Sequence, residues 1–237
     1  MSVSSNHSFN NIKAIVTDIE GTTGSISFVH QVLFPYAKEH LPEFVRKQQD
    51  RSDVVEQITA VRAEIGQPSA DIEAVIAQLL AWIEADKKVT PLKALQGLVW
   101  ENGYKTQAYK GHVYDDAFQC LQQWQQDNLR LFIYSSGSVY AQKLLFGYSD
   151  FGDLNPLFEG YFDTRVGGKK ESASYQAIVE NIALPADQIL FLSDVLGELD
   201  AAKNAGLRTV QLVREVGMET GEHQQVSSFD QITLSDS

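Results

Sequence analysis

The sequence has a single cysteine, Cys120, among its 237 residues. One thiol can form neither a disulfide framework nor a cysteine-based metal site. Cys120 falls in the amphipathic run 115–127, where we expect a small buried core thiol rather than a nucleophile. The five histidines lack the spacing of a zinc site, since no two stand one helical turn apart: His7, His30, His40, His112 and His223.

Basic clusters are also missing. The chain carries 31 Asp and Glu against 19 Lys and Arg, a formal net charge of −12. An anionic polymer or membrane surface would be repelled overall, so we expect neither a nucleic-acid nor a membrane partner. A small anionic substrate can still be held by a few local cations and backbone N–H groups. The acidity therefore does not exclude phosphate chemistry.

Long hydrophobic runs are absent as well. The longest apolar segment, 74–83, is too short and too interrupted to span a bilayer. Residues 1–11 are polar and lack the basic start and apolar stretch of a signal peptide. With 43% apolar and 21% charged residues, the composition is that of an ordinary globular protein. We therefore expect a cytoplasmic protein.

Strand and helix patterns alternate over most of the chain. Residues 12–17 form a short apolar, β-branched run that suits a buried strand. After residue 114, helical runs alternate with further strand-like segments, of which the last closes the series: 129–134, 160–163, 189–192 and 207–213. This alternation predicts an α/β fold with a Rossmann-like, mostly parallel sheet and helices on both faces.

The stretch between these parts has a different hydrophobic pattern. Over residues 28–112, apolar side chains recur every three or four positions, which predicts four or more helices. Asp71 and Thr90 are candidate N-caps. Prolines are expected to mark helix entries and breaks: Pro35, Pro42, Pro68 and Pro91. We predict a helical cap of residues 28–112, inserted into an α/β core of residues 1–27 and 113–237.

Reactive polar residues follow three of the predicted strands: Asp18, Ser135 and Asp194. One acid after a strand is weak evidence, because Asp also caps helices and starts turns. In an open parallel sheet, however, the carboxyl ends of the strands meet at one edge, where ligands bind. Lys169 lies on an adjoining loop and supplies a positive charge. The four side chains are therefore expected to converge.

The segment Asp18-Ile-Glu-Gly-Thr-Thr23 carries the strongest local signal. Its two carboxylates, Asp18 and Glu20, can point into one pocket when the chain turns between them. One can then act as nucleophile while the other transfers protons. Gly21 allows the sharp turn that this requires.

These residues resemble the motifs of the haloacid dehalogenase superfamily. The resemblance implies that Asp18 attacks phosphorus and that Glu20 protonates the leaving oxygen. It further implies that Ser135 holds the phosphoryl group and that Lys169 neutralises charge. Asp194, followed by Glu198 one helical turn later, matches the acidic motif that anchors Mg²⁺. The implied metal ligands are Asp18, an oxygen of Glu20 and Asp194, while Ser135, Ser136 and Lys169 bind the substrate.

Glu20 stands where most phosphatases of the superfamily have aspartate. Together with the first motif, several blocks closely resemble the enolase-phosphatase family of methionine salvage: 33–36, 95–97, 134–139, 141–147 and 191–195. This resemblance implies a monomeric enzyme that enolises 2,3-diketo-5-methylthiopentyl-1-phosphate and then dephosphorylates it to an acireductone. Glu20 is one candidate for the group that removes the carbon-bound proton.

Several alternatives stay open at this stage. Lys170 is as near in sequence as Lys169, Ser136 can instead cap the helix that begins near Val139, and Glu198 can be a first-turn acid favoured by the helix dipole. The chain can also be a generic small-molecule phosphomonoesterase, or a non-enzymatic module that binds a phosphate ligand. A carbon–halogen hydrolase generally needs no acid two residues after the nucleophile, so Glu20 argues against that branch.

Overall fold

The computed structural model describes residues 7–235. The chain divides into two compact units, one running up to Ile26 and again from Gly111 onward, the other Ser27–Lys110. The predicted boundaries, 27/28 and 112/113, lie within two residues of these divisions. That the two units act as a catalytic core and a cap stays a prediction.

The first unit is built on a six-stranded sheet in which every neighbouring pair is parallel, with the order β4-β3-β2-β5-β6-β7. The strand β2 is fully buried and lies between β3 and β5. The predicted α/β fold is confirmed. The strands of the sheet are β2 (Ala14–Thr17), β3 (Arg130–Tyr134), β4 (Gly160–Phe162), β5 (Ile189–Ser193), β6 (Arg208–Leu212) and β7 (Gln224–Val226).

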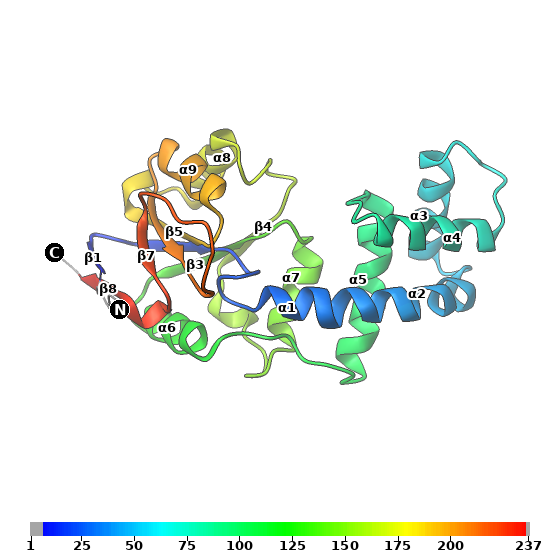
Figure 1. Ribbon diagram of the computed structural model, residues 1–237, viewed down its shortest axis with the longest axis horizontal. Coiled ribbons are helices and arrows are strands. Elements are labelled where there is room, and N and C mark those ends of the chain that lie inside the picture. Colours follow the sequence, from blue (N-terminus) through cyan, green and yellow to red (C-terminus); the bar gives the residue numbers. More distant parts are fainter. Residues whose placement is uncertain (1–6, 236–237) are drawn as a thin grey trace. The chain divides into compact units, whose positions relative to one another are not determined.

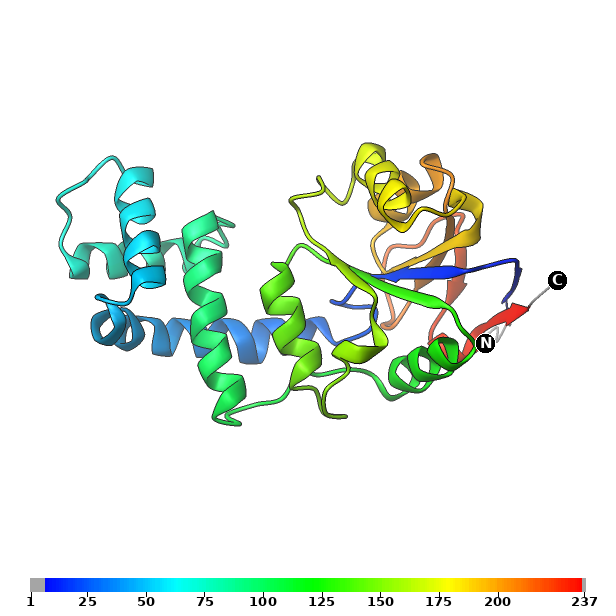
Figure 2. The same cartoon turned by 180° about the vertical axis from the view of Figure 1, so that it is seen from behind.

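Helices cover both faces of this sheet, as Figures 1 and 2 show from opposite sides. One face carries α8 (Ser172–Ile182) and α9 (Leu196–Asn204), whose apolar side chains join those of β2, β3 and β5 in one core cluster. The other face carries α6 (Asp115–Gln126) and α7 (Val139–Gly147). Short 3₁₀ turns complete the connections: η2 (Asn155–Leu157), η3 (Ala186–Gln188) and η4 (Phe229–Gln231).

The prediction that residues 207–213 close the strand series was wrong. β7 adds an edge strand, and β8 (Ile232–Ser235) pairs in parallel with β1 (His7–Asn10) in a separate two-stranded sheet. Neither β7 nor β1 has an apolar signature, because Gln224 and Gln225 are exposed and β1 is largely polar. Short edge strands that bury few side chains lack the alternation by which strands are recognised.

The second unit consists of helices, which confirms the predicted all-helical segment. The short α1 (Ile26–Phe28) and the π-helical η1 (Val29–Leu33) lead into four longer helices. These share a core cluster that includes Leu41, Leu79 and Leu95. The longer helices are α2 (Phe34–Gln48), α3 (Ser52–Glu64), α4 (Ile72–Glu84) and α5 (Thr90–Lys105).

The helix boundaries partly follow the predicted signals. Asp71 caps α4, because its side chain accepts a hydrogen bond from Ala74 N. Thr90 is not an N-cap; it is the first residue of α5, and the extended Val89 precedes it. Pro42 lies inside α2 rather than at a break. Of the helices in residues 7–235, none combines the length and apolarity needed to cross a bilayer.

Candidate active site

Asp18 directly follows the central strand and is 5% exposed. Its backbone N–H donates to Leu192 O at 2.9 Å, so the ladder between β2 and β5 extends one residue past the strand. Its carboxylate oxygen Oδ1 accepts a hydrogen bond from Ile19 N at 2.8 Å. The strand and the turn together fix both the backbone and the side chain of Asp18.

The turn after Asp18 is held by its own hydrogen bonds. Thr22 N and Gly24 N both donate to Ile19 O, and the Thr23 hydroxyl donates to Asp18 O at 3.0 Å. Gly21 has φ +75°, a conformation that L side chains rarely adopt. A Cβ added there would lie 2.5 Å from Asp194 Oδ2. Glycine is therefore needed both for the turn and for the close approach of Asp194.

Lys169 reaches this site from the loop that precedes α8. Its Nζ lies 2.7 Å from Asp18 Oδ1 and 2.7 Å from Glu198 Oε2, and its side chain is 9% exposed. Burial lowers the pKa of Lys169, but the two carboxylates outweigh that effect, so the pKa is raised and the ammonium persists. Lys170, the alternative, is exposed.

Two tyrosines hold the loop that carries Lys169. Tyr175 donates a hydrogen bond to Lys169 O at 2.7 Å, and Tyr134 donates to Gly167 O at 3.0 Å. The Lys169 ammonium also lies 5.7 Å from the centroid of the Tyr134 ring. Both rings are buried in the core under the sheet edge. The position of the ammonium is therefore set by the packing of the fold.

Glu198, in the first turn of α9, is a buried partner of Lys169 and more than a helix-dipole acid. Ser193 donates a hydrogen bond to Glu198 Oε2 at 2.9 Å, and Ser193 Oγ in turn accepts from Val195 N. Burial, and then the negative charge of Asp18, raise the pKa of Glu198. The single positive charge of Lys169 cannot neutralise both buried carboxylates, Asp18 and Glu198.

Asp194 follows β5 at the same edge of the sheet. The Thr22 hydroxyl donates to Asp194 Oδ1 at 3.3 Å. Burial, and then repulsion by Asp18, raise the pKa of Asp194 to about 6. Among the described residues, the ion pairs give Asp18 and Glu198 one shared ammonium, that of Lys169, and Asp194 adds a third carboxylate nearby. This excess of negative charge suits a divalent cation.

The donor set also fits a hard cation. Within residues 7–235, no three His, Cys, Asp or Glu side chains gather in a metal-binding cluster. A metal at this edge of the sheet would thus have two carboxylate ligands, those of Asp18 and Asp194. Its other oxygen ligands would come from backbone carbonyls and water. Mg²⁺ is commonly bound in this way, because it retains several waters. Glu20, whose oxygen is the predicted third ligand, is half-buried and forms a β-bridge with Gly24.

The loop after β3 carries the two predicted substrate-binding serines. Ser135 is buried, and its hydroxyl accepts a hydrogen bond from Gly137 N at 3.2 Å. Ser136 is partly buried. The N-cap of α7 is Ser138, whose hydroxyl accepts from Ala141 N, so the alternative of Ser136 as the cap was wrong.

Sequence reasoning missed two side chains that fix this loop. Gln142 is 2% exposed, and its Nε2 donates to Gly137 O and Phe162 O. Asp163, just after β4, accepts from Val139 N, the first residue of α7. Asp163 is a further acid at a strand end, and that position was its signal. Gln142 lies in the block 141–147, which resembles the enolase-phosphatase family, but that resemblance gave no role to any single residue of the block.

Cys120 is half-buried in α6 rather than fully buried, because its position lies at the edge of the apolar face. Burial, and then the charge of Asp116, raise the pKa of its thiol to about 11. The thiolate is the nucleophilic form, so the expectation that Cys120 is no nucleophile agrees with this environment.

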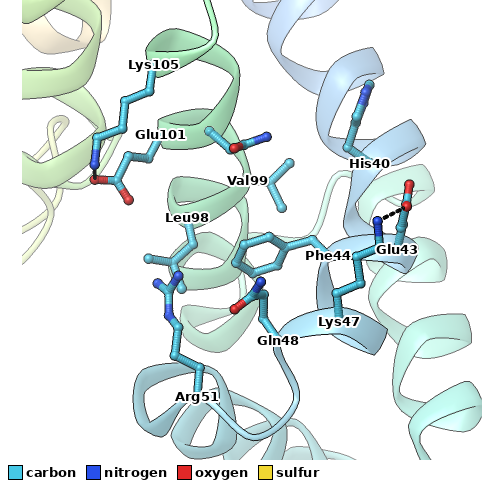
Figure 3. Close-up of a pocket in the computed structure, with 11 residues that line it drawn as sticks. His40, Glu43, Phe44, Lys47, Gln48, Arg51, Leu98, Val99, Glu101 and Lys105 are labelled. Carbon is cyan, nitrogen blue, oxygen red and sulfur yellow. Dashed lines mark hydrogen bonds and ion pairs between the residues drawn. The ribbon is translucent and has the colours of Figure 1, made fainter.

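A separate pocket of about 450 Å³ lies within the helical unit, between α2 and α5 (Figure 3). Phe44, Leu98 and Val99 supply its apolar lining. Its lysines pair with glutamates that also line it: Lys47 contacts Glu43 at 2.5 Å and Lys105 contacts Glu101 at 2.6 Å. Arg51, also in the lining, pairs with Asp53. Ammonium groups already neutralised in this way offer little to an anionic ligand. The charged centre at the edge of the sheet is the better candidate.

Comparison with known proteins agrees with this geometry. The sequence model of the haloacid dehalogenase-like hydrolases matches residues 12–206. Among solved structures, the UTR4 protein of Saccharomyces cerevisiae aligns with a TM-score of 0.79 and 36% identity, covering 94% of this chain and 100% of that one. L-2-haloacid dehalogenase from Xanthobacter autotrophicus aligns with a TM-score of 0.52 at 20% identity, over 87% of this chain and 79% of its own, which shows a shared fold.

Sequence relatives are closer. Enolase-phosphatase E1 of Pseudomonas aeruginosa strain LESB58 is 59% identical over 94% of this chain and 99% of its own. Enolase-phosphatase E1 of Serratia proteamaculans strain 568 is 55% identical over 94% of this chain and 97% of its own. Identity at this level extends over nearly the whole length of both proteins. The chain therefore belongs to the enolase-phosphatase E1 family of the haloacid dehalogenase-like hydrolases.

Proposed function

We propose that this protein is a bifunctional enolase-phosphatase that converts 2,3-diketo-5-methylthiopentyl-1-phosphate to an acireductone in methionine salvage. The observation that carries the phosphatase half is the buried contact between Lys169 Nζ and Asp18 Oδ1 at the carboxyl edge of the sheet. Relatives at 55–59% identity that bear the name enolase-phosphatase support the bifunctional assignment.

Asp18 acts as the nucleophile. Ile19 N and Lys169 Nζ both contact Oδ1, which leaves Oδ2 as the attacking oxygen. A bond forms between Oδ2 and phosphorus while the bond from phosphorus to the substrate oxygen breaks, and Glu20 gives that oxygen a proton. Water then attacks the aspartyl-phosphate, which releases inorganic phosphate and restores Asp18. Splitting the hydrolysis in this way replaces one difficult step with two easier ones.

Charge stabilisation comes from the surrounding side chains. Lys169 offsets negative charge on the nucleophile and on the phosphoryl group, while Ser135 and Ser136 supply hydrogen-bond donors to the phosphoryl oxygens. Asp18, the Glu20 backbone oxygen and Asp194 would hold Mg²⁺. The metal supplies Lewis-acid stabilisation of phosphoryl and carbonyl oxygens. The excess negative charge around Lys169 supports this ligand set.

Enolisation precedes phosphate release. A proton leaves the carbon next to a carbonyl, and a proton is returned to the carbonyl oxygen to give the enol. Glu20 is our candidate for the group that takes the carbon-bound proton, because it is the second carboxylate of the same turn. We expect the protein to act as a cytoplasmic monomer on this small molecule, with neither nucleic acid nor membrane as partner, given its net charge of −12.

The test is incubation of the purified protein with the diketo phosphate and Mg²⁺, following enol absorbance and released phosphate together. A transient enol that rises before phosphate appears supports the bifunctional enzyme. Phosphate without an enol would instead indicate a generic phosphomonoesterase. Absence of phosphate release from any phosphate monoester would refute the phosphatase assignment and favour a ligand-binding module.

A further inference from the structure

Arg214 lies just after β6 and far in sequence from the turn that follows Asp18, yet its guanidinium binds that turn. Nε and Nη2 donate to the Thr22 carbonyl at 3.1 and 2.8 Å. Nη1 donates to Asp116 Oδ2 at 2.8 Å and to Ser227 O at 3.3 Å. The Arg214 side chain is 8% exposed, and its charge-assisted hydrogen bonds to Thr22 O and Asp116 are partly buried.

The guanidinium has little freedom to move. Its central carbon lies 4.3 Å from the Tyr114 ring centroid and 5.3 Å from that of Phe229. Asp116 is itself fixed, because Oδ2 also accepts from Phe229 N at 2.7 Å. Residues in or next to α6 and η4, about 110 positions apart in sequence, thus hold Arg214 in place. Lysine cannot replace this planar fork, which donates to a carbonyl and a carboxylate together.

Thr22 connects this anchor to the reaction centre. Its hydroxyl donates to Asp194 Oδ1, while its carbonyl is taken by Arg214. Two other carbonyls of the turn are bound within it, Ile19 O by the amides of Thr22 and Gly24, and Gly24 O by Gly21 N. Thr23 O accepts from Tyr114 N, a backbone amide just before α6. The Thr22 carbonyl, by contrast, is bound by a side chain that lies 192 residues further along the chain.

We propose that Arg214 is a positioning residue, which fixes the 20–22 backbone and so aims Glu20 at the leaving oxygen of the substrate. The inference rests on the proposed function and assigns a role within it. Asp18 is held separately, by β2 and Lys169. The Glu20 carbonyl is also a proposed metal ligand, so the comparison is made at saturating Mg²⁺. Under that condition, loss of Arg214 should impair protonation of the leaving group more than attack by the nucleophile.

The test compares Arg214→Lys and Arg214→Met with Asp116→Asn, using two substrates. p-Nitrophenyl phosphate releases a stable phenolate and needs little proton donation, whereas the alkyl diketo phosphate needs it fully. We expect the Arg214 variants to lose kcat on the alkyl substrate by about tenfold more than on the aryl one. Asp116→Asn alters the same cluster but retains the contact between Arg214 and Thr22 O. Its loss of kcat should therefore be the same on the alkyl and the aryl substrate.

Hydrogen exchange of the metal-free variants gives a readout that does not depend on turnover. Amides 20–22 should exchange faster in both Arg214 variants than in Asp116→Asn. Equal losses on the two substrates, with or without faster exchange, would overturn the proposal. If Arg214→Met does not fold, Arg214→Lys carries the comparison. A wild-type protein that hydrolyses neither ester would overturn the proposed function itself, and this inference with it.

Discussion

The Glu198 carboxylate lies as close to Lys169 Nζ as the Asp18 carboxylate does, at 2.7 Å in each case. One ammonium therefore joins the candidate nucleophile to an acid in α9. The contact is buried, which makes it stronger than a surface ion pair but also costly to break, because an unpaired buried charge is left behind.

Lys169→Met should abolish turnover and also destabilise the protein. It leaves Asp18 and Glu198 without their shared cation, and breaking such a buried pair costs about 3 kcal/mol or more. Phosphate release and urea unfolding measure the two effects. Lys170→Met is the matched control, since that neighbouring side chain is exposed and should leave both measurements close to wild type. Equal losses in the two variants would contradict the assignment of Lys169.

Asp18→Asn should remove phosphate release while leaving the fold intact, because the amide keeps the shape of the side chain and loses the attacking oxygen. We expect kcat to fall by at least about 10⁴-fold. Circular dichroism checks the fold, and Asp187→Asn, on the exposed turn η3, is the control substitution. Retention of wild-type turnover in Asp18→Asn would rule out Asp18 as the nucleophile.

Asp194→Asn should stabilise the metal-free protein at neutral pH. The folded protein raises the pKa of Asp194 from 3.8 to about 6, so the folded state holds this proton more tightly than the unfolded chain. Wild-type stability therefore falls as the pH rises from about 4 to 6, and the full cost is present above about pH 6. The gain from Asp194→Asn is at most about 3 kcal/mol there and shrinks toward pH 4.

Urea titrations in the presence of a chelator, at pH 5 and pH 7.5, measure this difference. With added Mg²⁺, wild type should become the more stable of the two proteins. Mg²⁺ stabilises the folded wild type by binding to it, whereas the variant lacks one of the proposed metal ligands. A variant that is less stable than wild type at both pH values without metal would show that Asp194 is not repelled in the folded state.

Removal of divalent metal should stop phosphate release, and Mg²⁺ should restore it. The proposed site has two carboxylates, with backbone and water oxygens as the other ligands, which suits the six short bonds of Mg²⁺. Ca²⁺ takes six to eight oxygen ligands at longer distances. Ca²⁺ should therefore restore little activity. The measurement is phosphate release after treatment with a chelator, followed by addition of each ion in turn; full activity in excess chelator would exclude a metal role.

Gln142→Leu should loosen the loop that carries Ser135 and Ser136. It removes the hydrogen bonds to Gly137 O and Phe162 O while keeping a side chain of similar size. Because this loop is proposed to bind the phosphoryl group, we expect KM for the substrate to rise severalfold with a smaller change in kcat. Gln123→Leu, on the exposed side of α6, is the control. A change in kcat alone would point to another role.

Much of the sheet was predictable because its central strands are apolar runs that end in polar residues. Asp18, Ser135 and Asp194 each follow such a strand, and parallel strands bring those ends to one edge. The predicted ends of helices and strands lie close to the observed ends where buried apolar residues set the pattern, as in α6 and β5. Thr90 was misassigned because Thr favours both the N-cap and the first turn, and only the backbone of Val89 decides between them.

Contacts that join remote polar residues were beyond prediction. Nothing in the sequence pairs Arg214 with Thr22, since neither stands in a recognisable pattern and the bond reaches a backbone carbonyl. The role of Glu198 was open for a similar reason: helical spacing puts it near Asp194, but only the fold shows that it pairs with Lys169. Such pairings depend on how loops approach one another rather than on periodicity.

The central place of β2 also has a consequence for synthesis of the protein. β2 leaves the ribosome before β5, one of its two neighbours, which follows about 170 residues later. At roughly 5–20 residues per second, that delay is on the order of ten to thirty seconds. During this interval β2 exposes an unpaired apolar edge of the kind that promotes aggregation. The strand that precedes the proposed nucleophile thus gains from chaperone protection until its partner β5 has been made.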